Sequence, residues 1–268
     1  MFWDYLESTL QLILTIVMLL GCLFQYINSK KRGWIYLVLF FLGTLVSSYH
    51  WTAYLIIMGD QPNTTDAISY IGWNFAFAAL LFLLWQLKTP EERRYFHPLM
   101  LLPIPINIYQ LTLYLPFGGE ANSIYQVTVL TAVACLALQN ILWHRKRKQD
   151  GPEKILPAIA ALYFVCCDFA MWTTSCFGEP IGKLYYLFSI LASLGYIFLL
   201  WSVRRYYRVE KQTDEISGVQ RENILKAVYF TMVVLLCAFG GIIVGNWMRD
   251  TITASLQEAT SSNGHTQL

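Results

Sequence analysis

Residues 8–27 read STLQLILTIVMLLGCLFQYI, a run of 20 residues without a charge. A helix that crosses the hydrocarbon core of a bilayer needs about 20 mainly apolar residues, so this run predicts a transmembrane helix. The whole chain agrees, because 56% of its 268 residues are hydrophobic and only 13% are charged. Soluble domains carry about 25% charged residues. The chain is therefore expected to be an all-α integral membrane protein.

Seven further runs of similar character follow the first. They cover residues 33–58, 67–87, 98–116, 123–143, 155–177, 184–203 and 227–247. The sequence therefore predicts about eight transmembrane helices, of which the first seven form a bundle over residues 1–203. Pro103, Pro105 and Pro116 interrupt the fourth helix. Because proline removes a backbone donor and breaks the helical ladder, we expect this helix to be kinked or partly unwound.

The basic residues gather on one side of this predicted path. Of the 19 Lys and Arg residues, only Lys183 and Arg249 fall on the other side. Connections rich in Lys and Arg face the cytoplasm. This rule predicts a cell-membrane protein with both termini outside. It also places residues 204–226 in a cytoplasmic connector and residues 248–268 in an extracytoplasmic tail behind the eighth helix.

The sequence resembles itself at an offset of about 116 to 119 residues. The motif FLLW at residues 82–85 recurs at residues 198–201, and the match is collinear over three helices. We therefore predict two parallel three-helix repeats, at residues 8–87 and 123–203. The helix at residues 98–116 would be the linker that restores the orientation of the second repeat.

The order of three, one and three helices resembles the architecture of PQ-loop and SWEET transporters. This resemblance implies a transporter for small solutes, and it covers the first 203 residues. The Pro-Gln dipeptide that gives the family its name is missing, since the first and fifth predicted helices contain no proline. That departure weakens the transporter interpretation.

A second resemblance is carried by YHW at residues 49–51 and IGW at residues 71–73. The two motifs, with a last helix leading to an extracytoplasmic tail, resemble bacterial membrane-embedded sensor modules. In those proteins seven or so helices precede a histidine-kinase or diguanylate-cyclase output domain. The resemblance implies a sensory or receptor module that binds a small or lipophilic ligand in the outer half of the bundle. A structural subunit of a membrane complex is a third alternative.

Asp168 is the only acidic residue inside a predicted span. A charge at the centre of a membrane helix costs about 2.5–3.5 kcal/mol on insertion scales, so such acids usually face the bundle interior. Asp168 is therefore a candidate ligand, ion or proton site, and the alternative is a neutral acid hydrogen-bonded between helices. His50 lies one position from the repeat equivalent of Asp168 and is a candidate partner. Its alternative position is at the membrane interface.

The remaining candidate ligand-binding residues share the predicted outer half of the bundle. They are Tyr49, Trp51, Trp73, Asn74 and Trp172. Aromatic walls bind cations and small organic ligands. Aromatic side chains with a polar tip also favour the membrane–water boundary, and amides often bridge two helices, so both structural alternatives stay open.

Partner predictions rest on the C-terminal part of the chain. Gly241 and Gly245 have the small-xxx-small spacing that lets helices approach closely, either within the chain or in a dimer. The charged connector at 204–226 is a candidate docking segment for a signalling partner. The sequence shows no nucleotide-binding loop, metal-ligand spacing, catalytic triad or haem motif. It therefore predicts a lipid bilayer and a small ligand as partners, with no enzymatic activity, cofactor, metal or nucleic acid.

Overall fold

The computed structural model describes residues 2–62, 67–117, 119–147, 151–178 and 180–210. These residues form helices and contain no β-strand. Seven segments among them are long and apolar enough to cross a membrane, which is the architecture of an all-α, multi-pass membrane protein. The predicted eighth helix at 227–247, with Gly241 and Gly245, lies outside the described residues. So do the tail at 248–268 and all but the start of the connector.

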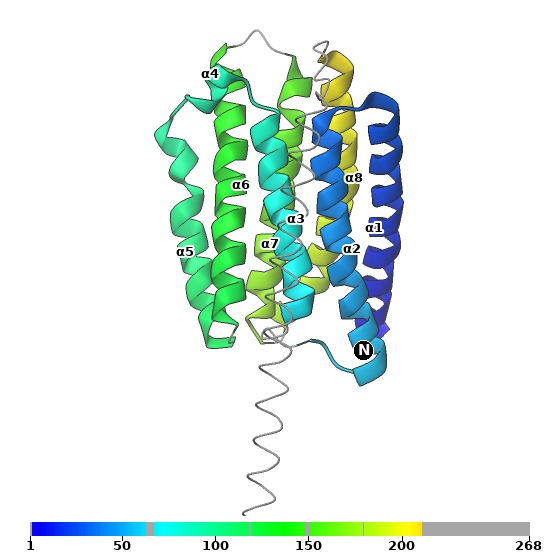
Figure 1. Cartoon of the computed structure of the whole chain (residues 1–268). Coiled ribbons are helices and arrows are strands. Elements are labelled where there is room, and N and C mark those ends of the chain that lie inside the picture. The colour runs from blue at the N-terminus through cyan, green and yellow to red at the C-terminus, as the bar shows by residue number, and fades with distance from the viewer. Residues whose placement is uncertain (1, 63–66, 118, 148–150, 179, 211–268) are drawn as a thin grey trace, which may run out of the picture. The chain divides into compact units, whose positions relative to one another are not determined.

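Seven helices make up the bundle shown in Figure 1. They are α1 (Phe2–Ser29), α2 (Arg32–Met58), α3 (Ala67–Gln86), α5 (Pro103–Tyr114), α6 (Glu120–Arg147), α7 (Leu156–Ser175) and α8 (Leu184–Val209). Between them lie the short helix α4 (Pro90–Arg93) and the 3₁₀ turns η1 (Pro98–Leu101), η2 (Leu115–Phe117), η3 (Pro152–Lys154) and η4 (Ile181–Lys183). The irregularity expected at 98–116 is present as η1 and η2, one at each end of α5. Pro103 starts α5, where its missing N–H leaves no helical hydrogen bond unmade.

Local sequence features determine where α2 ends and where α4 begins. Gly59 ends α2 with φ of 70°, and its N–H donates to the carbonyl of Leu55 at 3.0 Å. This left-handed conformation favours glycine. Thr89 starts α4, because its hydroxyl accepts from the N–H of Glu92 at 3.2 Å and Pro90 follows at the first helical position. The turn after α3 is therefore sharp, and it directs Glu92 back toward the bundle.

The helices pack in a closed order. α1 contacts α2, α2 contacts α3, α3 contacts α6, α6 contacts α7, α7 contacts α8, and α8 returns to α1. α5 packs outside this ring, against α6 and α7. The order is the same in each half, since the first helix of each predicted repeat contacts the second and the second contacts the third. A duplication would produce this order, although the duplication itself stays a prediction.

Aromatic packing joins three helices at the centre of the ring. The ring centroid of Phe40 on α2 lies 5.6 Å from that of Phe164 on α7, and Phe41 lies 5.7 Å from Tyr196 on α8. All four side chains are buried, and such pairs add about 0.5–1.5 kcal/mol each beyond the area they bury. α2 and α3 approach so closely that a Cβ on Gly43 would lie 2.6 Å from the carbonyl oxygen of a glycine on α3.

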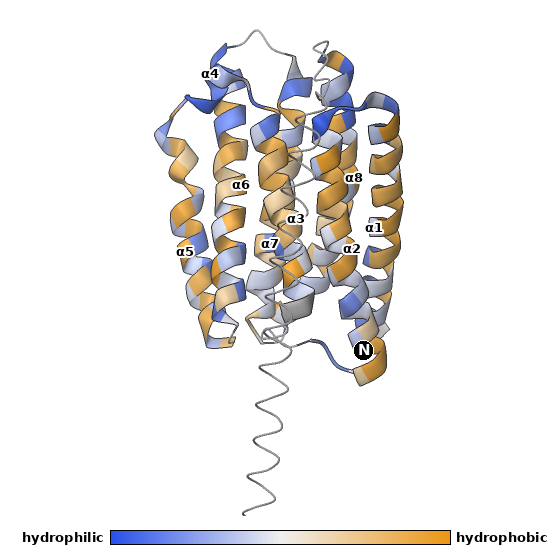
Figure 2. Cartoon of the chain, in the orientation of Figure 1, coloured by the Kyte–Doolittle hydropathy of each residue, from blue (hydrophilic) through white to orange (hydrophobic). Residues whose placement is uncertain are grey.

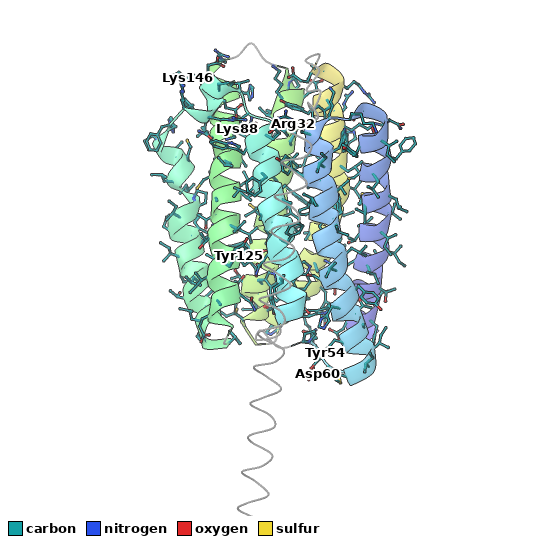
Figure 3. All side chains as sticks on the ribbon, in the orientation of Figure 1. Arg32, Tyr54, Asp60, Lys88, Tyr125 and Lys146 are labelled. Atoms are coloured by element: carbon teal, nitrogen blue, oxygen red, sulfur yellow. The ribbon has the colours of Figure 1, made fainter. Side chains whose placement is uncertain are left out.

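The outer surface of the bundle is apolar, as Figure 2 shows by the hydrophobic residues along α1, α2 and α5. Leu10, Ile13, Val17, Leu20 and Phe24 of α1 are all exposed, which suits contact with lipid chains. Figure 3 shows Arg32, Lys88 and Lys146 at one end of the bundle, and Tyr54 and Asp60 at the other. We call these the basic end and the distal end. That the distal end lies outside the cell stays a prediction.

Candidate functional site

Asp168 is buried inside the bundle, with 4% of its surface exposed. It lies on α7, and its Oδ2 accepts a hydrogen bond from Nε2 of Gln126 on α6 at 3.4 Å. The apolar residues around position 168 make α7 a membrane-spanning helix, and helical periodicity then turns the single acid inward. The sequence-based expectation that this acid faces the interior is therefore met. Its function stays a prediction.

Asp168 lines an enclosed space that we call the inner cavity. Its walls are formed by Glu7, Gln11, Thr44, Trp51, Trp73, Phe77, Gln126, Phe164, Asp168, Met171, Trp172, Tyr185, Ala192 and Tyr196. Its volume is about 30 Å³, which is room for about two water molecules. Six of the seven long helices contribute to the walls, so the cavity lies inside the ring. Only a small group fits beside the carboxyl in this conformation.

A larger space, the vestibule, adjoins the inner cavity. It is lined by Tyr70, Tyr114, Phe117, Asn122, Ser123, Gln126, Trp172, Ser175 and Cys176, and has a volume of about 100 Å³. Most of these residues lie at helix ends on the distal side, where α3 begins, α5 ends, α6 begins and α7 ends. Gln126 and Trp172 line both spaces. A molecule in the vestibule would therefore reach the carboxyl past one amide and one indole.

The three tryptophans chosen from the sequence lie together around the inner cavity. The ring centroids of Trp51 and Trp73 are 5.4 Å apart, and Trp172 lies 6.1 Å from Trp73 and 6.5 Å from Trp51. Trp51 is buried, at 8% exposure. Trp73 and Trp172 are half-buried, and all three indoles line the inner cavity. Whether the indoles bind a ligand stays a prediction.

The structure does not bring the other three predicted site residues to the inner cavity. Nδ1 of His50 lies 2.8 Å from Oγ of Ser69 on α3, so the expected pair with Asp168 is not formed. Tyr49 is 65% exposed and points away from the core. Asn74 is buried but is not among the cavity-lining residues, and its Oδ1 has no hydrogen-bond partner among the described residues.

Glu7 is a wall residue that sequence reasoning missed. The first span was predicted to begin at residue 8, whereas α1 begins at Phe2, so the membrane-spanning part of α1 also carries Glu7. Asp168 is therefore not the only acid in a span. The carboxylate of Glu7 accepts hydrogen bonds from the hydroxyls of Ser189 on α8 and of Ser8, the latter at 3.5 Å. A polar stripe at helical spacing, with Gln11 one turn further on, was the available signal.

A second buried polar centre lies at the basic end. Nζ of Lys88 donates to the carbonyl of Leu136 at 2.8 Å and to the side chain of Gln139, and it lies 3.9 Å from Oε1 of Glu92. Glu92 is 1% exposed, and Nδ2 of Asn140 donates to its Oε1 at 2.7 Å.

His144 completes this group, which we call the Lys88–Glu92 cluster. Its Nε2 lies 3.9 Å from Oε2 of Glu92. Burial lowers the pKa of Lys88 to about 8, although the nearby carboxylate of Glu92 opposes that shift. Sequence reasoning treated Lys88 only as an interfacial basic residue. The contacts come from residues nearly 50 positions away along the chain, which local patterns do not reveal.

No group of three or more His, Cys, Asp or Glu side chains in the described part of the chain has an arrangement that could hold a metal ion. A comparison with known proteins finds no matching family model, no similar curated protein and no matching solved structure. The functional argument therefore rests on the geometry of the two spaces and their walls.

Proposed function

We propose that the chain is a membrane-embedded sensory or receptor module that binds a small ligand through the distal end of its bundle. The observation that carries this proposal is the position of Asp168, buried at the wall of a cavity that adjoins a wider, aromatic vestibule. Small-molecule sites are concave, mainly apolar and supplied with a few converging polar groups. The vestibule and inner cavity together have that character.

The surroundings of Asp168 favour binding over packing. A buried acid that serves packing alone is usually compensated by a cation or by several good hydrogen bonds. Asp168 has hydrogen bonds from the neutral side chains of Gln126, at 3.4 Å, and Trp172, has no cation beside it, and lines empty volume. An intramembrane acid that keeps such a position is a functional-site candidate by default.

The end of α8 offers a route for an output signal. α8 contributes Tyr185 and Tyr196 to the inner cavity, and at its other end it is held by the turn between α1 and α2. Nζ of Lys31 donates to the carbonyls of Tyr207 and Glu210, at 3.2 and 3.1 Å. The N–H of Gly33 donates to the hydroxyl of Tyr207 at 3.0 Å. Movement of α8 at the cavity would therefore reach the start of the connector.

A small-solute transporter is the second candidate, and the matching packing order of the two three-helix halves favours it. Alternating access commonly uses two such halves that rock around a central site. The two functions differ in flux, because a receptor binds its ligand without moving it across the membrane.

Purified protein in liposomes separates these functions. Binding would be followed by the intrinsic tryptophan fluorescence, to which Trp51, Trp73 and Trp172 at the cavity contribute, and flux by uptake of radiolabelled amines, amino acids and sugars. A receptor gives saturable binding that Asp168→Asn weakens, without uptake. Uptake that Asp168→Asn abolishes would favour the transporter. If the substitution changes neither quantity, the site is wrong and a structural subunit becomes the better description. Asp60→Asn, at an exposed acid, is the matched control.

A further inference from the structure

The inner cavity has two acids and no compensating basic residue. Glu7 and Asp168 both line it, from α1 and α7, and none of the described residues that line the cavity or the vestibule is Lys, Arg or His. The hydrogen-bond donors to both carboxyls are neutral, namely the side chains of Gln126, Trp172, Ser189 and Ser8. Two carboxyls in a water-poor space attract a cation strongly, since the effective dielectric constant there is far below that of water.

The hydroxyl oxygen of Ser48 also favours a ligand that donates hydrogen bonds. Ser48 lies on α2 between Thr44 and Trp51, one turn from each, and both of those residues line the inner cavity. Helical periodicity directs Ser48 to the same side of α2, although Ser48 itself is not among the residues that line the cavity. Its side chain is 1% exposed, and its Oγ has no hydrogen-bond partner among the described residues. A buried hydroxyl without a partner is stabilised when a hydrogen-bond donor reaches it.

We infer that the inner cavity is a binding site for a primary ammonium group, and that the ligand of the proposed receptor is a small organic amine. The inference rests on the proposed function and names its ligand class. An ammonium group has three N–H donors and no acceptor. Glu7 and Asp168 line the cavity and supply carboxylate acceptors, the unpartnered Oγ of Ser48 lies on the same side of α2, and the faces of the surrounding indoles attract a cation. The body of the ligand then lies in the vestibule, beyond Gln126 and Trp172.

The size of the cavity selects among cations. A volume of about 30 Å³ accommodates an ammonium group, which is about as large as a water molecule. A trimethylammonium group is several times larger and has no N–H donors. The inference therefore predicts that methylation of the amine abolishes binding, although an aromatic cage alone would favour the methylated form.

The test uses three probes of one shape on the full chain in nanodiscs: 2-phenylethylamine, its N-trimethyl derivative and 2-phenylethanol. Tryptophan fluorescence gives the dissociation constants. We expect saturable binding of the primary amine, and affinities at least tenfold lower for the other two probes. Glu7→Gln and Asp168→Asn should each lower the affinity for the amine at least tenfold, and Ser48→Ala should lower it severalfold. Glu91→Gln, at an exposed acid of the basic end, should leave it unchanged.

Several results would overturn the inference. If 2-phenylethanol binds as tightly as the amine and depends on Asp168, the ammonium site is wrong while the receptor proposal stands. If the amine does not bind, or binds equally to Glu7→Gln, or if NaCl alone gives the same saturable change, the ammonium site is wrong as well. Thermal unfolding of each variant distinguishes lost binding from lost folding. If Glu7→Gln does not fold, the Ser48→Ala variant and the methylated probe decide the outcome.

Discussion

Two buried polar centres lie in opposite halves of this bundle, and they differ in how charge is compensated. In the Lys88–Glu92 cluster a cation and an anion lie 3.9 Å apart, with amide and carbonyl groups hydrogen-bonded to both. At the inner cavity two acids, Glu7 and Asp168, line one small space, and the groups that donate hydrogen bonds to them are all neutral. The comparison teaches that burial of a charge does not by itself mark a functional site. An uncompensated charge next to empty volume is the stronger candidate for one.

The largest change in the free energy of unfolding should come from breaking the ion pair between Lys88 and Glu92. Lys88→Met leaves the carboxylate of Glu92 buried without its cation, and we expect a loss of about 3–5 kcal/mol in the free energy of unfolding. Reversible unfolding in mixed detergent micelles measures it. The double variant Lys88→Met with Glu92→Met should recover most of the loss, because neither charge remains. A loss below about 1 kcal/mol in the single variant would show that the cluster is not a coupled pair.

The same cluster predicts a pH dependence. Burial lowers the pKa of Lys88 to about 8, below its ordinary value of 10.5. Between these two values the unfolded chain binds a proton that the folded chain does not, so this lysine makes stability rise with pH from about 8 to 10.5. Below pH 8 its contribution is constant. Unfolding measured at several pH values should show this rise in the native chain and lose it in Lys88→Met. An unchanged profile would contradict the assignment.

A smaller change in the free energy of unfolding, and one that stabilises the protein, is expected at the inner cavity. Asp168→Asn removes an uncompensated charge while keeping the shape of the side chain, so the free energy of unfolding should increase by about 1 kcal/mol, as is common when a functional residue is replaced. The same unfolding assay measures it, with Asp60→Asn as control. A loss of more than about 3 kcal/mol would mean that Asp168 is a packing residue, and the contrast between the two centres would collapse.

The smallest change in stability is expected for a substitution that tests whether the vestibule is accessible from outside the cell. Cys176 lines the vestibule, so a charged, membrane-impermeant thiol reagent should label it from outside intact cells. Cys176→Ser should remove this labelling while changing stability by less than about 0.5 kcal/mol. Mass spectrometry of the labelled peptide gives the readout. Labelling of Cys176 only after the cells are permeabilised would place the distal end on the cytoplasmic side and reverse the predicted topology.

Hydropathy located the seven long helices that lie within the described residues. The predicted spans 33–58 and 67–87 differ from α2 and α3 by one residue at most, because charged or turn-forming residues bound the apolar runs on both sides. The start of α1 was placed six residues too late, because the predicted span of uncharged residues begins only after Asp4 and Glu7. Asp4 is buried and Glu7 is half-buried, and both accept hydrogen bonds from distant residues, such as the one from Tyr186 to Asp4 at 2.7 Å.

The candidate site was predictable only in part, because contacts between distant residues complete it. Asp168 could be found because one acid interrupts an apolar run. Its partners could not, because Gln126 and Glu7 lie on other helices and no local pattern specifies which helices meet. His50 was chosen from the alignment of the two repeats, and its ring instead lies beside Ser69 on the neighbouring helix.

The clamp at the end of α8 has a thermodynamic consequence. A hydroxyl of Tyr207 occupies the space where a Cβ on residue 33 would lie, so glycine is required there for the contact. In a receptor with a cavity at one end of α8 and a clamp at the other, linkage is reciprocal. Any molecule that loosens or tightens the clamp changes the ligand's affinity by the same factor by which the ligand changes that molecule's. Under the proposed receptor function, a partner that binds at the clamp would therefore set the sensitivity of the receptor as well as receive its signal.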